Sequence, residues 1–334
     1  MPTRPNFSTA RPSLTGMLLA AAALTALATT ARAQEPAPGV SPTTPQSLAR
    51  PAATEDSDAL RLTFSLEGTH QFRTDLRTDT GEYQVSRLNS GTGLSYRLNP
   101  SITLSLDTSS EVSWYEFKNA TTLLSPPPGA ASSAKPFHVM YSTSINPGIR
   151  YGIDEHWFVL GGGILQVAGD RHADIFDSIS GGGFVAGGYR FSDDLTIYGG
   201  LLAKSELEDD ALVVPLIGVN WKITDQLRLD TRGLGFILSF QLAPTVRTFI
   251  DGTYESRTYR LSDDNFLPEG IIRDRQIPIA LGVAWKPLPT LEFTGRLGVI
   301  AWQEFTIDDK NGNRINRFRS DPTPFVGLRA EFSF

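Results

Sequence analysis

The sequence predicts an all-β protein, a transmembrane antiparallel up-and-down barrel of about fourteen strands. Three observations support this prediction. Apolar and polar residues alternate almost continuously from Leu60 onward, a short motif recurs at six strand ends, and the last strand alternates to the final residue. Because successive side chains of a strand point to opposite faces, this pattern suits a wall between lipid and water.

The first 33 residues predict a secretory signal peptide that is removed on export. Arg4 and Arg11 precede a short apolar core at 17–29, and Ala31-Arg32-Ala33 has the small-residue pattern of a cleavage site. The apolar core is shorter than the ~20 residues needed to span a membrane as a helix. No later apolar run approaches that length, so we expect the chain to cross a membrane as a closed barrel.

Residues 34–59 are rich in proline and alanine and show no periodicity. Such a composition cannot bury enough apolar surface to order the chain, which predicts a disordered periplasmic linker. An alternative is that this segment enters the barrel as an N-terminal plug. The barrel itself is expected over 60–334.

A seven-residue motif, an aromatic residue followed by a turn-former and then an apolar residue, separates six pairs of alternating runs. Each copy ends one run and starts the next, which predicts a tight turn. Aromatic rings with an apolar body and a polar tip suit the lipid–water interface, so we predict an aromatic girdle near the periplasmic turns. Its members are Tyr96, Tyr151, Tyr189, Trp221, Phe240 and Trp285.

Six turns and both barrel ends on one side predict seven hairpins, hence about fourteen strands. The expected strands are 60–72, 82–98, 101–117, 136–151, 156–168, 178–191, 195–205, 211–222, 226–232, 234–242, 245–260, 275–286, 290–304 and 323–334. The longer segments Leu124–Ala134, Leu261–Asp274 and Glu304–Pro322 are expected to be outer loops. One hairpin, 227–240, is shorter than the ~9–11 residues per strand that a crossing needs. It is either a low part of the wall or a sign that the barrel has twelve strands.

The last strand places Val326, Leu328, Ala330, Phe332 and Phe334 on one face, and residues such as Arg329 and Glu331 on the other. It resembles the C-terminal strand of Gram-negative single-chain outer-membrane β-barrel proteins, which closes the barrel and ends in phenylalanine. The resemblance implies an outer-membrane location, contact with outer-membrane lipid, and recognition of Phe332 and Phe334 by the barrel-assembly machinery. No characterised subfamily is recognised, so no functional residue is transferred. A soluble, secreted all-β protein is the competing fold.

If the apolar residues of each strand face outward to lipid, the residues that alternate with them face the lumen. The charged candidates are Arg87, Asp107, Glu111, Arg228, Asp230, Arg247, Asp251, Glu255, Arg257, Glu292, Arg296, Arg329 and Glu331. The middle strands instead point Ile164, Phe184, Leu202 and Leu216 inward. This apolar wall is either covered by a segment of the protein itself, such as the outer loop 118–135, or is a track for an apolar ligand.

The composition argues against several functions. Without the signal peptide the chain has 27 basic and 36 acidic residues, a net charge of −9 that disfavours nucleic acid as a partner. There is no cysteine, and we predict no cofactor, metal or catalytic residue. His138 and Ser142 are too far apart along one strand to form a catalytic pair, and Asp308–Asn313 departs from the EF-hand pattern.

The leading functional prediction is therefore a passive channel for small solutes, whose selectivity the sequence leaves open. A structural or surface-interaction barrel with a plugged lumen and a lipid-modifying outer-membrane enzyme are the alternatives. An open, charged lumen would favour the channel, whereas a salt-bridged or plugged lumen would favour the other two.

Overall fold

The structure is a computed structural model that describes residues 60–77, 81–120 and 137–334. The predicted signal peptide, the predicted linker and residues 121–135 of the predicted covering loop lie outside the described residues. Within the described ranges, no helix is long and apolar enough to cross a membrane.

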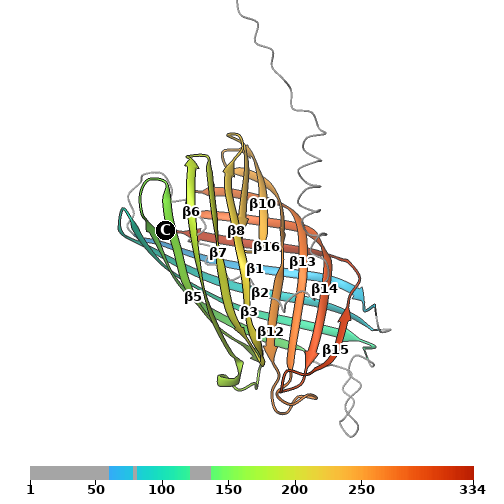
Figure 1. Ribbon diagram of the computed structural model, residues 1–334. Helices are drawn as coiled ribbons and strands as arrows, with labels where there is room; N and C mark the ends of the chain where they lie inside the picture. The colour runs from blue at the N-terminus through green and yellow to red at the C-terminus, as the bar shows by residue number, and fades with distance from the viewer. Residues whose placement is uncertain (1–59, 78–80, 121–136) are drawn as a thin grey trace, which may run out of the picture. The chain divides into compact units, whose positions relative to one another are not determined.

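The described chain forms a single antiparallel sheet that closes on itself (Figure 1). Its strands are β1 (Leu60–Asp75), β2 (Glu82–Asn99), β3 (Ile102–Lys118), β4 (Val139–Gly152), β5 (Trp157–Asp170), β6 (Ile179–Ser192), β7 (Leu195–Glu206), β8 (Asp209–Lys222), β9 (Leu227–Arg232), β10 (Gly235–Ala243), β11 (Val246–Thr253), β12 (Glu255–Arg260), β13 (Ile271–Leu288), β14 (Leu291–Asp308), β15 (Arg314–Arg319) and β16 (Thr323–Ser333). A short 3-10 helix, Phe176–Ser178, precedes β6.

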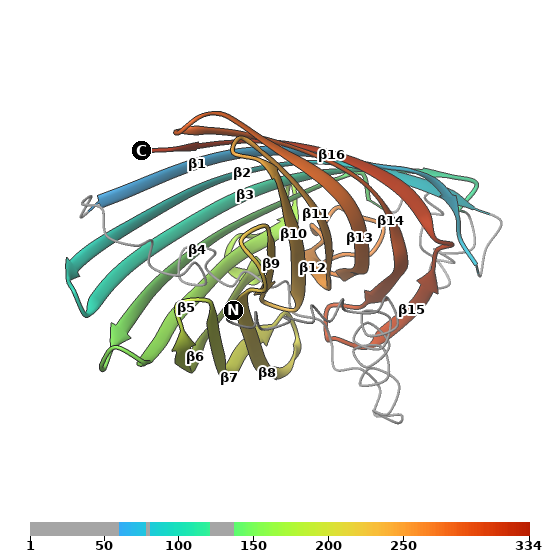
Figure 2. The same ribbon diagram turned by 90° about the horizontal axis from the view of Figure 1, so that it is seen from above.

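The barrel closes where the last strand pairs with the first. β16 pairs with β1 from Thr63↔Ser333 to Gln71↔Phe325, and with β14 on its other edge (Figure 2). Beyond β16, the amide of Phe334 donates to the Leu62 carbonyl at 2.8 Å. Closure removes the exposed sheet edges that a membrane would not tolerate.

The sixteen strand segments make a wall of fourteen strands. β11 and β12 pair with β13 in one continuous register and are separated only at Thr253–Tyr254, near Pro278, which cannot donate to the ladder. β15 only extends β14 as a hairpin beyond the wall. The predicted fourteen-stranded barrel is therefore confirmed, and the short hairpin β9–β10 is a low part of the wall.

Side-chain exposure alternates along the wall strands. On β13, Ile279, Leu281 and Val283 are exposed, whereas Ala280 and Ala284 are buried. Large apolar side chains are exposed around the outer surface on this pattern, which a protein in water rarely tolerates over so continuous an area. The outer face is therefore the lipid-facing side of a transmembrane barrel.

All six motif segments make short turns between consecutive strands. These turns share one end of the barrel, here called the turn end, with Leu60 and the C-terminus. The opposite, loop end carries β15 and the longer connections.

Two outer loops are shorter in the structure than the sequence predicts. β13 begins at Ile271 rather than 275, and β14 continues to Asp308 rather than 304. Residues 271–276 and 303–308 are buried on both faces, so the apolar–polar alternation that marks a half-buried strand is missing there.

Candidate functional site: the barrel interior

The interior near the turn end carries ion pairs that remain accessible to water. The Arg247 guanidinium lies 3.1 Å from a Glu292 carboxylate oxygen, and both side chains are 31% exposed. Arg329 pairs with Glu331 at 2.7 Å, and both side chains are about one-quarter exposed. Charged side chains with this exposure keep much of their hydration, so this end of the interior is an aqueous vestibule.

A second group of charges lies further from the turn end and joins four strands. The Arg296 guanidinium of β14 contacts the Glu67 carboxylate of β1, and it lies 3.2 Å from the Asp251 carboxylate of β11. Arg329 of β16 approaches the same Glu67 at 3.8 Å. Parity had assigned Arg296, Asp251 and Arg329 to the lumen, and the structure brings them together across the seam of the barrel.

A third group sits deeper and crosses the barrel interior. Arg257 of β12 pairs with Glu111 of β3 at 2.8 Å and with Glu255 at 2.9 Å. The Tyr259 hydroxyl donates to Glu111 at 3.3 Å. β3 and β12 are not neighbours in the wall, so these contacts bridge the lumen.

The deepest polar group centres on Asp274 of β13. Its carboxylate accepts hydrogen bonds from Arg87 of β2 at 2.7 Å, from Tyr115 of β3 at 2.7 Å and from Gln303 of β14 at 2.6 Å. Gln303 in turn accepts a hydrogen bond from Gln71 of β1 at 2.7 Å. We call Arg87, Tyr115, Asp274, Gln303, Gln71 and Tyr83, whose hydroxyl also bonds Gln303, the Asp274 network.

The Asp274 network closes the interior to water. The Arg87 and Asp274 side chains are 5% and 0% exposed, compared with 31% for the Arg247–Glu292 pair at the turn end. Each oxygen of Asp274 has a partner, although Arg87 Nε and Gln71 Oε1 are buried without a hydrogen-bond partner among the described residues. The burial of the network makes it a polar plug rather than a hydrated channel lining.

An apolar core continues the plug toward the loop end. It packs aromatic rings from several strands, including Phe117, Phe137, Phe305 and Phe318. Phe305 and Phe318 stack with ring centroids 5.0 Å apart, and Phe117 meets Phe137 edge-on at 5.0 Å. Such rings exclude water, so the described strands fill the loop end of the barrel as the core of a soluble domain would be filled.

The other face of β13 and β14 near the loop end is charged but also buried. Arg273 contacts Asp308, and lies 3.5 Å from Glu206 at the end of β7. Glu304, 1% exposed, pairs with Arg319 and Arg317 at 2.9 Å each. These contacts hold the loop-end parts of β13 and β14 inside the barrel.

The apolar wall forms a distinct buried cluster on β5–β8. Ile164, Phe184, Leu202 and Leu216 all lie in it. Aromatic rings there lie flat on glycines of neighbouring strands. A Cβ on Gly188 would come within 2.1 Å of the Phe158 ring, and one on Gly218 within 1.8 Å of the Tyr198 ring. The glycine-rich stretches of these strands therefore permit close ring packing.

The remaining predicted lumen charges do not join the plug. Arg228 and Asp230 pair with each other along β9 at 2.9 Å. Asp107 is half-buried on β3, facing Gly93 and Asn146 in the ladder.

Sequence reasoning missed Asp274, Gln303, Gln71 and Tyr83, although Arg87 and Glu111, which lie close to them, were identified. Asp274 and its neighbours fell in a predicted loop, and neutral Gln71 and Gln303 carried no charge signal. A search for interior polar residues beyond the predicted strand ends would have found Asp274, and a search for neutral polar residues within the strands would have found the other three.

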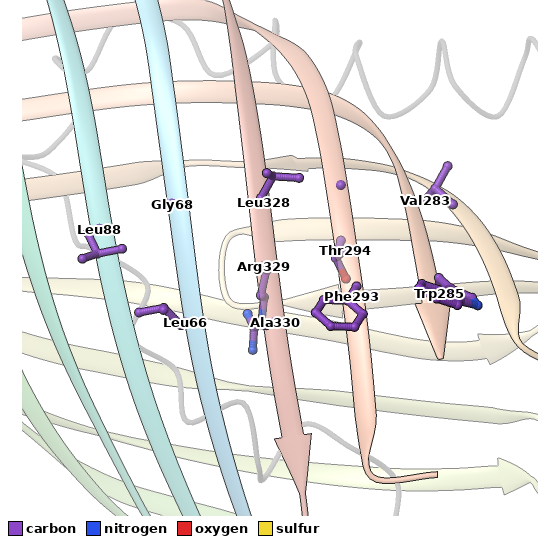
Figure 3. A pocket seen from close by; sticks show the side chains of 11 residues that line it. Leu66, Gly68, Leu88, Val283, Trp285, Phe293, Thr294, Leu328, Arg329 and Ala330 are labelled. Atoms are coloured by element: carbon purple, nitrogen blue, oxygen red, sulfur yellow. The ribbon is translucent and has the colours of Figure 1, made fainter. Parts of the chain in front are cut away.

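Five of the six predicted interface aromatics have exposed side chains, and Tyr189 is half-buried. Tyr189 meets Trp157 edge-on at 4.7 Å, and Trp285 stacks on Phe293 at 6.0 Å. Trp285 and Phe293 also line a shallow apolar groove of about 510 Å³ on the outer face of the seam, together with Leu66, Leu88, Val283 and Leu328 (Figure 3).

The polar residues considered for catalysis or metal binding have other partners. His138 Nδ1 lies 2.8 Å from the Tyr115 carbonyl, and Ser142 accepts a hydrogen bond from Gln166 at 2.8 Å. Asp309 accepts backbone hydrogen bonds from Asn311 and Asn313 at 2.8 Å each, which makes a turn. In the described ranges, no cluster of acidic residues and histidines is arranged to hold a metal ion.

A scan of protein-family models and a search of curated proteins found no match. Among solved structures, the chain is similar to an outer-membrane channel from Pseudomonas putida F1, with 9% identity, a TM-score of 0.46, and coverage of 85% of this chain and 99% of that chain. It is also similar to the P. putida toluene transporter TodX (8% identity, TM-score 0.42, covering 83% and 90%). A third similar structure is the translocator domain of the autotransporter NalP from Neisseria meningitidis, with 12% identity, a TM-score of 0.37, and coverage of 84% of this chain and 90% of that chain. At these identities, ligands and activities are not transferred. These proteins, like this chain, are antiparallel β-barrels.

Proposed function

We propose that the chain is an outer-membrane channel for small solutes whose outer end is closed by the barrel's own strands. In this proposal the turn end faces the periplasm and the loop end faces the outside. The aromatic residues near the turns then lie at the inner membrane–water interface, and the last strand, with Phe332 and Phe334, is bound by the assembly machinery.

The observation that carries the proposal is the gradient of exposure among interior charges. Accessible pairs such as Arg247–Glu292 line the turn end, whereas Arg87–Asp274 is buried toward the loop end. A purely structural barrel has no need of a hydrated, charged vestibule. Solutes can therefore reach the interior from the periplasmic side, and passage requires the Asp274 network to separate.

Single-channel conductance in planar bilayers tests the proposal. The wild-type protein should give rare or small steps, and Asp274→Ala should give larger or more frequent ones because it removes the centre of the plug. Arg247→Ala is the matched control, because it removes an accessible charge outside the plug. It should change ion selectivity without changing the frequency of opening.

An absence of conductance from both wild type and Asp274→Ala, with both correctly folded, would refute the channel proposal. That result would favour the structural or surface-interaction barrel, for which the burial of the Asp274 network is the supporting observation.

A further inference from the structure

The barrel wall has a gap beside β8. β8 pairs with β7 along nearly its whole length, but with β9 only at Asn220, Trp221 and Lys222. β9 turns back early because Gly233, with a φ of 56°, occupies a tight turn. From Val219 toward the loop end, none of the described strands offers β8 a second ladder partner.

On the far side of the gap, β12 forms no ladder with β8 and meets it only at the loop end, where the Arg260 guanidinium lies 2.7 Å from the Glu208 carboxylate just before β8. The ladder between β10 and β11 ends at Gly235↔Thr253. Beyond that point β12 pairs with β13 but not with β10. Apart from β13, its ladder partner is β5, at Arg260↔Gly169. The Arg260 guanidinium fixes this position by donating to the Asp177 carbonyl at 3.0 Å and the Glu269 carbonyl at 2.8 Å. β12 thus crosses the interior, and the gap beside β8 is bounded at the loop end by the contact between Arg260 and Glu208.

The free edge of β8 is built to remain unpaired. The backbone N–H of Lys222 donates to the Asp194 carbonyl beside β7. The backbone N–H of Val219 donates to the Thr231 hydroxyl on the opposite side of β8, at 2.6 Å. Amides of successive residues point to alternate edges, so odd-numbered residues of β8 face the gap. Pro215 is one of them and has no N–H, so a strand could not complete a ladder there.

Both sides of this edge are apolar. Val213 and Ile217 face outward and are 58% and 74% exposed. Leu212 and Leu216 face inward and belong to the buried apolar wall. Apolar side chains therefore flank the edge of β8 on both sides, exposed on the lipid-facing side and buried on the inner side. Pro215 reduces the number of unpaired amides that hydrocarbon would contact.

We propose that this gap is a lateral opening through which an uncharged hydrocarbon exchanges between the membrane and the apolar wall. The apolar residues on both sides of the edge identify this occupant, because a charged or strongly hydrated solute would lose its hydration along such a path. The proposal goes beyond ion conduction. Entry from the membrane does not require the Asp274 network to open.

Cysteine labelling in lipid vesicles tests the opening, because the chain has no native cysteine. Leu216→Cys lies beside the gap, Leu160→Cys lies in the same wall on β5, and Val283→Cys faces lipid. A pyrene maleimide dissolved in the membrane should label Leu216→Cys at a rate close to that of Val283→Cys and several-fold faster than Leu160→Cys. Adding n-dodecane should slow labelling at position 216 but not at 283.

Folded variants are selected by heat-modifiable migration, and Leu202→Cys replaces Leu216→Cys if the latter does not fold. Labelling of position 216 as slow as that of 160, or faster labelling by a charged water-soluble thiosulfonate, would overturn the opening. Equal labelling with and without n-dodecane would overturn hydrocarbon binding. Conductance is measured separately, so failure of the channel proposal leaves these readouts unaffected.

Discussion

Asp274→Ala should destabilise the barrel more than the loss of any accessible interior charge. The substitution strands the Arg87 guanidinium, which is 5% exposed, and removes the acceptor of Tyr115 and Gln303. Removing one partner of a buried ion pair costs about 3–5 kcal/mol, because the remaining charge is uncompensated. Glu292→Ala, which breaks a pair with both members 31% exposed, should cost about 0–1 kcal/mol.

The double variant Arg87→Met/Asp274→Ala separates the ion pair from the rest of the network. Arg87→Met alone leaves Asp274 two neutral donors, at 2.7 and 2.6 Å, so its cost should be smaller than that of Asp274→Ala. The double variant should be no less stable than Asp274→Ala, because the stranded charge is gone. The resulting coupling energy should be of the order of 0.5–3 kcal/mol.

Reversible urea unfolding in lipid vesicles, followed by the fluorescence of the five tryptophans, measures these differences. Circular dichroism of each folded variant checks that the strand content is retained. If the double variant loses the sum of the two single losses, the Arg87–Asp274 contact is not a source of stability. The same is true if Asp274→Ala costs no more than Glu292→Ala.

Three further outcomes are expected. Deleting Phe334 should impair assembly because it removes the backbone pairing with Leu62 at 2.8 and 3.0 Å. Changing Phe334 to Asp should also impair assembly because it places a charge at the exposed end of the lipid-facing side of the closing strand, and normal heat-modifiable migration of either variant would contradict this. Gly218→Ala should destabilise the barrel by about 1–3 kcal/mol of overpacking and so lower its thermal midpoint, because the new Cβ would meet the Tyr198 ring. Gly187→Ala should leave the thermal midpoint unchanged, because no atom lies within contact distance of its Cβ position. The side chain and backbone of Asn313 hold the pKa of Asp309 below its ordinary value. These hydrogen bonds to the Asp309 carboxylate should therefore stabilise the turn fully above the ordinary pKa of aspartate. This stabilisation should be lost as the pH falls through the lowered pKa of Asp309. Proteolysis of the 308–314 turn that does not change with acidification would refute this.

Much of the wall could be predicted because a single-layer barrel imposes period two on every strand that separates lipid from water. The apolar wall on β5–β8 followed from parity alone, and so did the inward side of Glu111 and Arg257. The short hairpin was visible in the sequence, since the span from Leu227 to Phe240 is too short for two crossings.

The plug was not predictable by the same rule. Residues 271–276 are buried on both faces, so Ile271 and Ile272, adjacent apolar residues, give no alternation. Asp274 faces Arg87 only because β13 lies inside the barrel there, and the spacing of residues along the chain does not encode a contact between strands on opposite sides. Local patterning reports which face is apolar, but not which of two interior surfaces a strand meets.

The lateral gap and the interior plug have a common origin in two irregularities of the wall. Pro278 cannot donate to the ladder, which is interrupted there between β11 and β12, and the pairing of β13 with β14 skips Ala301 between Ile277↔Trp302 and Pro278↔Ile300. A bulge of this kind bends the strand and increases its twist. Beyond this level, β12, β13 and β14 turn inward, and Asp274 reaches Arg87 and Tyr115. Strands that have turned inward can no longer pair with β8, so closing the loop end of the barrel leaves most of the β8 edge without a ladder partner among the described strands.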